Sequence, residues 1–369
     1  MLFITKALKP ILVGLGLSFC ANSFLYADHL GVPHAKGNAL NPDTSLVGSL
    51  LYRNSNRGNN LSDSNPNGFS LDEAELQLAA DVDPYLRANT IFSAHRESGK
   101  WIFAPEEAYV ETLSLALATI KLGKFKSAFG KYNSVHTHAL PFIDNQLISK
   151  ALLGDDGMNG EGLSAAILLP AKWYSEVFLQ AINANTDPFK SASANATIEV
   201  IHLKNLWDLS DELTLEWGLS GADGPNNIID KHTSFYASDL TFKWRPVKGG
   251  KYSAFVWSNE FMSGNKNLNS DGTDNLLGVK SQGGYSFIQW QTAQRWWLQL
   301  RTEYVETSDS TANTKSFQRK NSFLLAYLPT EFSGLRLQYD QLVDQGERSE
   351  NRLMLQLNFS IGAHPAHSY

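Results

Sequence analysis

Two histidines separated by a single residue could bind a metal ion. His136 and His138 flank Thr137, and the carboxylate of Asp144 follows a few residues later. Imidazole nitrogens combined with a carboxylate oxygen suit a borderline divalent cation such as zinc. The spacing therefore predicts a site formed by His136, His138 and Asp144, at which zinc would bind transiently. The alternative is that both histidines hydrogen-bond to backbone or carboxylate groups around a packed loop.

Charged residues in several segments occupy every second position, opposite a row of apolar residues. Glu73 and Glu75, for example, have the parity opposite to Leu76 and Leu78. A period of two places successive side chains on opposite faces of a β-strand, so these charges share one face. The residues that we assign to the inward, pore-lining face are Glu73, Glu75, Arg87, Glu107, Glu111, Lys121, Glu216, Asp239, Arg301, Glu303 and Arg336.

A charged inward face predicts a water-filled lumen. The glutamates at positions 73, 75, 107 and 111 belong to the second and fourth expected strands, which lead up to a long loop, so they should lie near the constriction that this loop forms. Carboxylates in a confined passage raise the local concentration of cations. In the alternative, Arg87 and Lys121 neutralise these carboxylates and leave a passage of weak selectivity.

The same alternation reaches the end of the chain. In residues 352–361, Leu355 and Leu357 lie on one face of the expected strand, and Gln356 and Asn358 lie on the other. Taken alone, this strand suits a soluble sandwich as well as a membrane barrel. In a membrane barrel the apolar face contacts lipid and the polar face contacts the lumen.

The pattern predicts sixteen strands, and an even number is typical of single-chain bacterial barrels. The expected strands are residues 44–53, 69–82, 84–95, 104–115, 118–126, 162–169, 173–182, 196–204, 212–220, 234–245, 251–263, 284–292, 296–307, 322–328, 334–340 and 352–361. We therefore predict an all-β fold, a transmembrane antiparallel β-barrel of about sixteen strands with a porin-like architecture.

The links between the expected strands alternate in length. Long links include residues 54–68, 127–161, 264–283 and 308–321, and short links include residues 170–172, 206–211 and 329–333. Short periplasmic turns and long external loops alternate in this way in outer-membrane barrels. A soluble all-β sandwich, which remains the alternative, gives no reason for the rhythm. The third external loop, residues 127–161, should fold inward and narrow the pore.

The start of the chain predicts export. Lys6 and Lys9 precede an apolar run, and Ala27 offers a small residue for cleavage, so residues 1–27 are typical of a signal peptide. We expect a periplasmic segment at 28–43, the barrel at 44–361 and a C-terminal tail at 362–369. Cys20, the one cysteine, falls within the signal, so the mature chain would have no thiolate site. The expected location is the outer membrane.

Composition excludes several classes of function. The chain carries 31 basic and 37 acidic residues, a formal net charge of -6, which argues against nucleic acid as a partner. The sequence contains no nucleophile elbow, P-loop or paired-carboxylate catalytic motif, so we do not expect an enzyme. The expected partners are outer-membrane lipid and small solutes or ions. This architecture also allows a homo-oligomer, in which further copies of the chain would be partners.

Several segments resemble a known family. Residues 38–42, 68–76, 106–113, 123–138 and 355–362 are similar to those of bacterial outer-membrane proteins often labelled zinc-regulated TonB-dependent outer membrane receptors. The resemblance implies an outer-membrane barrel with a link to metal traffic. Relatives tend to carry a histidine-rich stretch after the signal, where this chain has His29 and His34.

The receptor label and the strand count lead to different functions. Energised receptors are barrels of about 22 strands that enclose a plug, whereas sixteen strands use nearly the whole mature chain. We therefore predict a porin-like channel that passes small, cationic solutes or metal ions by electrodiffusion, with zinc as a transient ligand at most. The alternatives are a zinc-linked TonB-dependent receptor and a structural surface barrel with a closed lumen.

Overall fold

A computed structural model of the chain describes residues 42–57, 67–97, 100–184, 189, 196–226, 231–270, 276–310, 312–346 and 349–362. The expected signal peptide, nearly all of the expected periplasmic segment and residues 363–369 of the expected tail lie outside these described residues.

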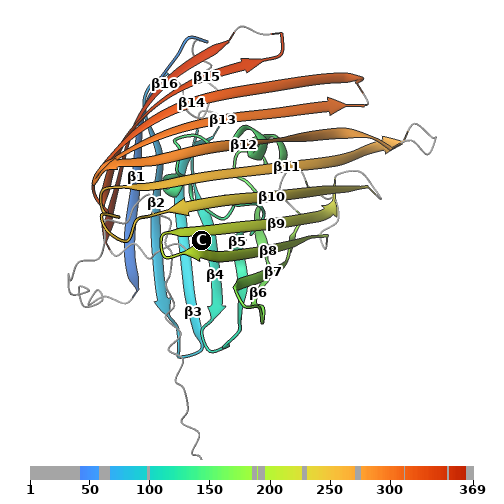
Figure 1. Cartoon of the computed structure of the whole chain (residues 1–369). Helices are drawn as coiled ribbons and strands as arrows, with labels where there is room; N and C mark the ends of the chain where they lie inside the picture. Colours follow the sequence, from blue (N-terminus) through green and yellow to red (C-terminus); the bar gives the residue numbers. More distant parts are fainter. Residues whose placement is uncertain are drawn as a thin grey trace, which may run out of the picture.

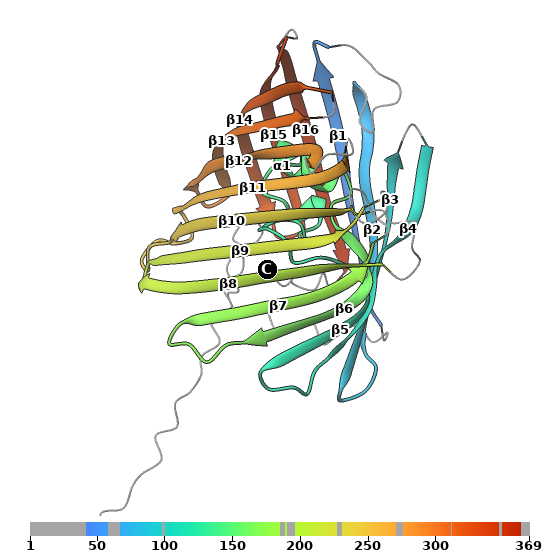
Figure 2. The same cartoon turned by 90° about the vertical axis from the view of Figure 1, so that its right-hand side faces the viewer.

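Sixteen antiparallel strands form one closed barrel, which confirms the predicted fold class (Figures 1 and 2). The strands are β1 Asp43–Ser55, β2 Gly68–Asp81, β3 Leu86–Glu97, β4 Lys100–Thr112, β5 Ala118–Lys126, β6 Asn159–Leu168, β7 Tyr174–Asn183, β8 Thr197–Ser210, β9 Leu213–Pro225, β10 His232–Trp244, β11 Ala254–Ser270, β12 Leu276–Ala293, β13 Trp296–Asp309, β14 Thr314–Thr330, β15 Ser333–Asp344 and β16 Glu350–Gly362. Each strand pairs with its neighbours in the sequence, and β1 pairs with β16.

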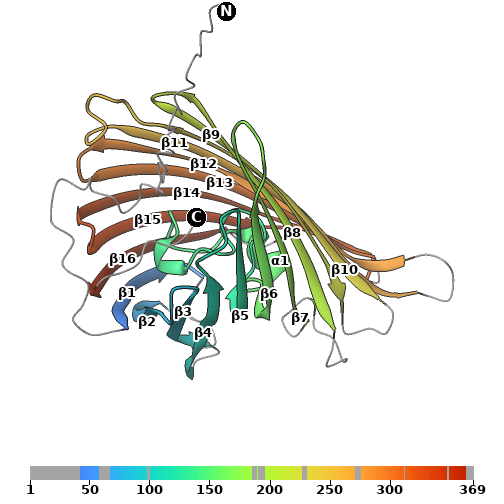
Figure 3. The same ribbon diagram turned by 90° about the horizontal axis from the view of Figure 1, so that it is seen from below.

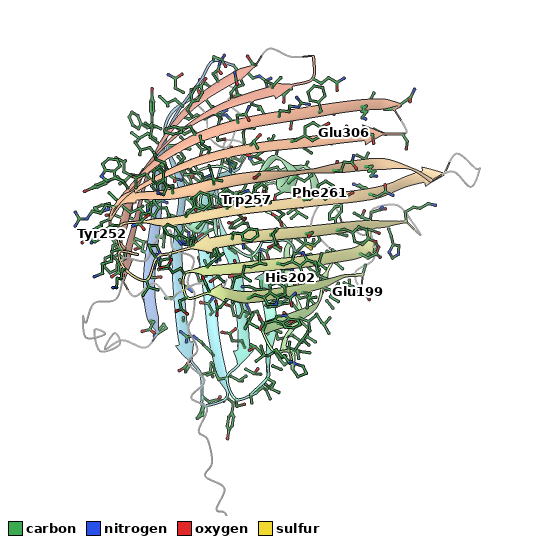
Figure 4. All side chains as sticks on the ribbon, viewed as in Figure 1. Glu199, His202, Tyr252, Trp257, Phe261 and Glu306 are labelled. Carbon is green, nitrogen blue, oxygen red and sulfur yellow. The ribbon has the colours of Figure 1, made fainter. Side chains whose placement is uncertain are left out.

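The side chains of the strands alternate between an exposed, largely apolar outer face and an inner face that is polar except where apolar residues pack against a long inner loop. On β11, Trp257 and Phe261 are 41% and 56% exposed on the outside, whereas Ser258 and Glu260 between them are buried (Figure 4). An outer face of large exposed apolar side chains needs an apolar environment, because a soluble barrel would leave this surface in water.

A long loop lies inside the barrel. We name residues 127–158, between β5 and β6, loop L3; it contains a short 3-10 helix, η1 (Thr137–Ala139), and the helix α1 (Leu147–Leu153). Figure 3 shows α1 between the strands β1–β6 on one side and the later strands on the other. L3 ends three residues before the expected boundary because β6 begins at Asn159. Neither described helix is long and apolar enough to cross a membrane.

Apolar packing holds L3 within the lumen. Phe129, Tyr132 and Phe142 of L3 are buried in one hydrophobic cluster with Phe235 of β10 and Phe287 of β12. The rings of Tyr132 and Phe142 meet edge to face, with centroids 5.6 Å apart, an arrangement that aromatic pairs prefer. Burial of several aromatic side chains in this way stabilises the inward position of the loop.

Two of the expected long links are mostly strand, and those expectations were wrong. β11 and β12 pair as far as Ser270 and Leu276, and β13 and β14 pair as far as Asp309 and Thr314. The sequence of these extensions shows no sustained alternation of apolar and polar residues, so a search for period two misses them. Their strand content follows from continued hydrogen bonding to a neighbour rather than from an apolar face.

An aromatic ring covers a glycine at the closing seam. Gly48 of β1 lies opposite Phe359 of β16, and a Cβ atom at Gly48 would overlap the phenyl ring. Aromatic coverage of a glycine on a neighbouring strand compensates for its missing side chain. The seam is therefore specified by side-chain packing as well as by backbone pairing.

The apolar outer face generates a depth-dependent prediction. Leu355 lies in the middle of β16 and Ile361 lies near its end, and both face outward. If lipid contacts this face, Leu355→Arg should destabilise the barrel by about 2–4 kcal/mol and Ile361→Arg by about 0–1 kcal/mol. Denaturant titration of vesicle-folded protein, followed by tryptophan fluorescence, measures both; equal losses would contradict lipid contact.

Candidate functional site

The two histidines of L3 meet four glutamates of the barrel wall. We call this group the histidine–carboxylate cluster; it consists of Glu73, Glu75, Glu106, Glu107, His136 and His138. Both imidazoles are buried. His136 Nδ1 lies 3.1 Å from Glu75 Oε1, and His136 Nε2 lies 3.2 Å from Glu107 Oε2. A single imidazole therefore contacts β2 and β4 at once.

His138 adds a second contact to the same wall. Its Nδ1 atom lies 3.3 Å from Glu75 Oε1 and 3.9 Å from Glu73 Oε2. The rings of His136 and His138 are stacked, with centroids 5.9 Å apart. Within two sets of three residues the possible ligand atoms all lie within 4.8 Å of one another, and Glu75 belongs to both sets. This geometry can hold a cation, or it can hold protonated imidazoles.

A β-bulge supplies the extra carboxylate. Ile91 of β3 pairs with Glu107, whereas the next residue, Phe92, pairs with Pro105, so Glu106 is the additional residue of β4. In a regular strand, Glu106 and Glu107 would point to opposite faces. The bulge lets both reach the histidines, at 3.6 Å for Glu106 Oε2 and His136 Nδ1.

The prediction from parity omitted Glu106 for this reason. In the sequence, Pro105 was the one sign of the bulge, because proline within a sheet occurs mainly at edges and bulges.

Asp144 lies in a different cluster, so the structure does not group it with the histidines as expected. Its carboxylate oxygens lie 2.6 Å from Arg301 Nη2 on β13 and 2.7 Å from Lys320 Nζ on β14. The Gln338 amide of β15 also donates a hydrogen bond to it, at 2.7 Å. These partners occupy its oxygens, and Asp144 therefore attaches L3 to another part of the wall.

The surroundings shift the pKa values of two L3 residues, His136 and Asp144. Burial alone would lower the pKa of His136, but the nearby carboxylates of Glu75, Glu106 and Glu107 raise it well above its usual value. Burial alone would raise the pKa of Asp144, but Lys320 and Arg301 hold it well below the usual range. Both shifts strengthen the charge pairing between L3 and the wall.

The first turns of L3 form a third attachment. Gly130 donates its backbone N–H to Ser220 Oγ of β9 at 2.9 Å, and Lys131 donates its N–H to Glu260 of β11 at 2.7 Å. Lys131 Nζ lies 3.1 Å from Glu216 of β9. Burial would lower the pKa of Lys131, but the Glu216 and Asp239 carboxylates outweigh it and raise the pKa.

Contacts of L3 extend around the lumen. Besides the strands named above, its backbone accepts hydrogen bonds from Arg336 of β15, at 2.6 Å, and from Asn358 of β16, at 3.3 Å. Ala128 donates to Gln180 of β7 at 2.9 Å. L3 thus binds strands on every side of the barrel, and it crosses the lumen instead of following one wall.

The predicted pore-lining residues fall into two groups by burial. Those packed inside the barrel around L3 are Glu73, Glu75, Glu107, Glu216, Asp239, Arg301, Glu303 and Arg336. Those that remain half-buried are Arg87, Glu111 and Lys121. The second group lies toward the ends of β3, β4 and β5 that are opposite to L3. The inner surface at L3 is therefore nearly dry, whereas the lumen beyond it remains accessible to water.

Comparison with known proteins gives one sequence relative. No protein-family model matches the chain. The chain is 31% identical over 343 residues to an uncharacterised protein of Aquifex aeolicus, and the match covers 82% of this chain and 70% of that protein.

Several solved structures share the fold. OmpT, an outer membrane protein of Vibrio cholerae, folded in vitro, has a TM-score of 0.57 at 10% identity, covering 87% of this chain and 97% of that one. An anion-selective porin from Comamonas acidovorans has a TM-score of 0.57 at 10% identity, covering 87% and 100%. The outer membrane channel DcaP of Acinetobacter baumannii has a TM-score of 0.56 at 12% identity, covering 87% and 96%. At identities this low the structural likeness shows the fold alone, a porin-like barrel.

The Asp144 attachment generates a prediction about pH. Asp144→Asn leaves Arg301 and Lys320 without this carboxylate, which should cost about 3 kcal/mol of unfolding free energy at neutral pH. Because the pKa of folded Asp144 is lowered, its contribution is present above about pH 4 and is lost as the pH falls through the lowered value. The difference between wild type and variant should stay constant from pH 7 to about pH 4.

Denaturant titrations at several pH values measure this difference, and limited proteolysis reports release of L3. Asp155→Asn is the matched control, because Asp155 belongs to the same loop but its side chain is 83% exposed. An equal effect of the two substitutions would contradict the attachment.

Proposed function

This chain belongs to the same family as the uncharacterised Aquifex aeolicus protein, and we propose that it is an outer-membrane channel for small cationic solutes or metal ions. The observation that carries the proposal is a closed barrel with an apolar outside and a charged inside, crossed by L3. The barrel supplies a route through lipid with no unpaired strand edge. L3 supplies the restriction that decides what passes.

The outer face supports a location in the outer membrane. Exposed apolar residues recur on strands around the whole barrel, including Leu163, Phe261, Leu300 and Leu355. A hydrocarbon phase satisfies such a surface, and strands can cross it only when every backbone group is paired. The expected signal peptide would export the chain across the inner membrane, which must precede insertion into the outer one. The resemblance to OmpT in a trimer form makes a homo-oligomer part of the proposal.

The distribution of charge supports cations over anions. Asp144 and Glu303 pair with Arg301 and Lys320, so the cluster on β13 and β14 is close to neutral. In the histidine–carboxylate cluster four carboxylates lie near two cationic groups: the ammonium of Lys126, whose Nζ is 2.6 Å from Glu106, and the imidazole of His136, whose pKa is raised. The local excess of carboxylate favours cations beside L3.

The filled lumen limits the size of the solute. The side chains around L3 are buried, and the half-exposed charges of Arg87, Glu111 and Lys121 lie beyond the loop. Passage therefore requires either a narrow route beside L3 or a movement of L3. Both favour single ions and small solutes over large ones.

Two other functions have a specific observation in their favour. A zinc-linked TonB-dependent receptor would use the histidine–carboxylate cluster to bind its metal, although such receptors have about 22 strands. A structural barrel with a closed lumen would explain why L3 packs so tightly against the wall. Purified protein in a planar bilayer separates the three. Steady conductance supports the channel, silence with zinc affinity supports the receptor, and silence without affinity supports the structural barrel.

Selectivity provides the sharper test of the channel. The variant Glu107→Gln with Glu111→Gln removes two inward carboxylates of β4 and should move the reversal potential in a salt gradient toward zero. Glu199→Gln is the matched control, because Glu199 lies exposed on the outer face of β8 (Figure 4) and its loss should leave the potential unchanged. A wild-type channel that prefers chloride would contradict cation selectivity.

A further inference from the structure

We infer that the histidine–carboxylate cluster is a binding site for a borderline divalent cation such as Zn²⁺, and that the bound ion joins L3 to the wall at β2 and β4. The ligands would be His138 Nδ1 with Glu73 and Glu75, or His136 Nδ1 with Glu75 and Glu106. Glu75 Oε1 is common to both sets. No ligand set of this composition is evident from the sequence, because the bulge brings in Glu106 and the fold brings β2 to L3.

The distances between the ligand atoms fit a tetrahedral ion. Zn²⁺ lies about 2.1 Å from nitrogen and oxygen ligands, which places the ligands about 3.4 Å from one another. The separations here are 3.1 Å and 3.3 Å from Glu75 Oε1 to the two imidazoles. They are 3.6 Å from Glu106 to His136 and 3.9 Å from Glu73 to His138. Small side-chain adjustments would therefore complete either set.

A second carboxylate orients one of the histidines. Glu107 Oε2 lies 3.2 Å from His136 Nε2, so the Nε2–H group can donate a hydrogen bond to Glu107. In this tautomer the Nδ1 lone pair is free to bind an ion on the side of Glu75 and Glu106. Histidines that bind metals commonly donate their other N–H to a carboxylate, which fixes the tautomer and raises the basicity of the ligand. Glu107 is thus placed to act as a positioning residue rather than a ligand.

Two buried carboxylate oxygens of the cluster are available as ligands. Among the described residues, Glu73 Oε2 is inaccessible to solvent and accepts no hydrogen bond, and Glu73 as a whole is 8% exposed. Glu106 Oε2 is also inaccessible and accepts no hydrogen bond within the described part of the chain. Lys126 Nζ lies 2.6 Å from the other oxygen of Glu106, so only the Oε2 atom of that carboxylate lacks a hydrogen bond. A buried oxygen without a hydrogen bond is costly, and coordination of a divalent ion would offset the cost at Glu73 Oε2 and Glu106 Oε2.

The donor set selects among cations. One imidazole with two carboxylates, as in either set, suits zinc, cobalt and similar borderline ions, whereas Mg²⁺ and Ca²⁺ prefer oxygen ligands alone. The competing arrangement is a pair of protonated imidazoles that hold the same carboxylates by charge. That arrangement predicts no saturable metal affinity, so a binding measurement distinguishes the two.

Bound metal would also affect the loop. His136 and His138 belong to L3, and Glu73, Glu75 and Glu106 belong to strands, so coordination crosslinks the loop to the wall. The effect of zinc on current rests on the proposed channel function, but the site itself does not. We expect zinc to slow proteolysis within L3 and to reduce the current through the wild-type channel.

The test uses the full mature chain, folded in detergent and stripped of metal with a chelator. Calorimetric titration with Zn²⁺ should give saturable binding, and Co²⁺ should develop the intense visible absorption of a four-coordinate site, while Mg²⁺ gives neither. Glu75→Gln alters the ligand that both sets share and should abolish the saturable binding of Zn²⁺. Glu107→Gln should weaken binding by about 10- to 100-fold, because it removes the orienting carboxylate.

His202→Gln is the matched control. His202 is a buried lumen histidine of β8 that bonds to Ser220 and lies outside the cluster (Figure 4), so its substitution should leave zinc binding unchanged. Heat-modifiable migration verifies folding of each variant. If a variant fails to fold, the wild-type protein still tests the site. Zinc should protect its L3 from proteolysis, and a chelator should reverse this protection.

Three outcomes overturn the inference: no saturable zinc binding by the wild type, equal binding by folded Glu75→Gln, or an equal loss in His202→Gln. If the protein conducts but does not bind zinc, the proposed site is rejected and the proposed channel function stands. If the protein binds zinc but does not conduct, the proposed channel function is rejected and the proposed site is supported.

Discussion

Pairing of β1 with β16 is the constraint on which the rest of the structure depends. It gives every strand two neighbours, so the sheet has no edge whose backbone groups would need water. Only a closed sheet can expose apolar side chains on its entire outer surface and keep polar ones within. Phe359 lies over Gly48 at this seam, and side-chain packing therefore supports the pairing that encloses the lumen.

Closure creates a confined interior, and buried charge then decides where L3 lies. Three groups of contacts hold the loop: Lys131 at its start, His136 and His138 in the middle, and Asp144 before α1. Each group places a charged or polar L3 side chain against opposite charges on the wall. Apolar packing fills the space between them. Removal of one partner leaves a buried charge without compensation, which makes the inward position specific as well as stable.

The alternation of residue types was enough to predict the barrel, its strand number and the inward side of most strands. It failed where the alternation carries no information. The bulge at Glu106 changes parity within a strand, and the sequence of the paired extensions of β11 to β14 shows no sustained alternation. Asp144 was assigned to the histidines by nearness in sequence, whereas its partners Arg301 and Lys320 lie far along the chain. Such contacts depend on the path of L3, which local sequence does not determine.

The central claim is that L3 restricts passage through an otherwise open barrel. The most direct measurement is the single-channel conductance of a variant in which residues 127–158 are replaced by a short flexible link, with heat-modifiable migration as the measure of folding. The account predicts a folded barrel with a conductance several-fold above that of the wild type and with weaker cation selectivity. A folded variant that conducts no better than the wild type would contradict it.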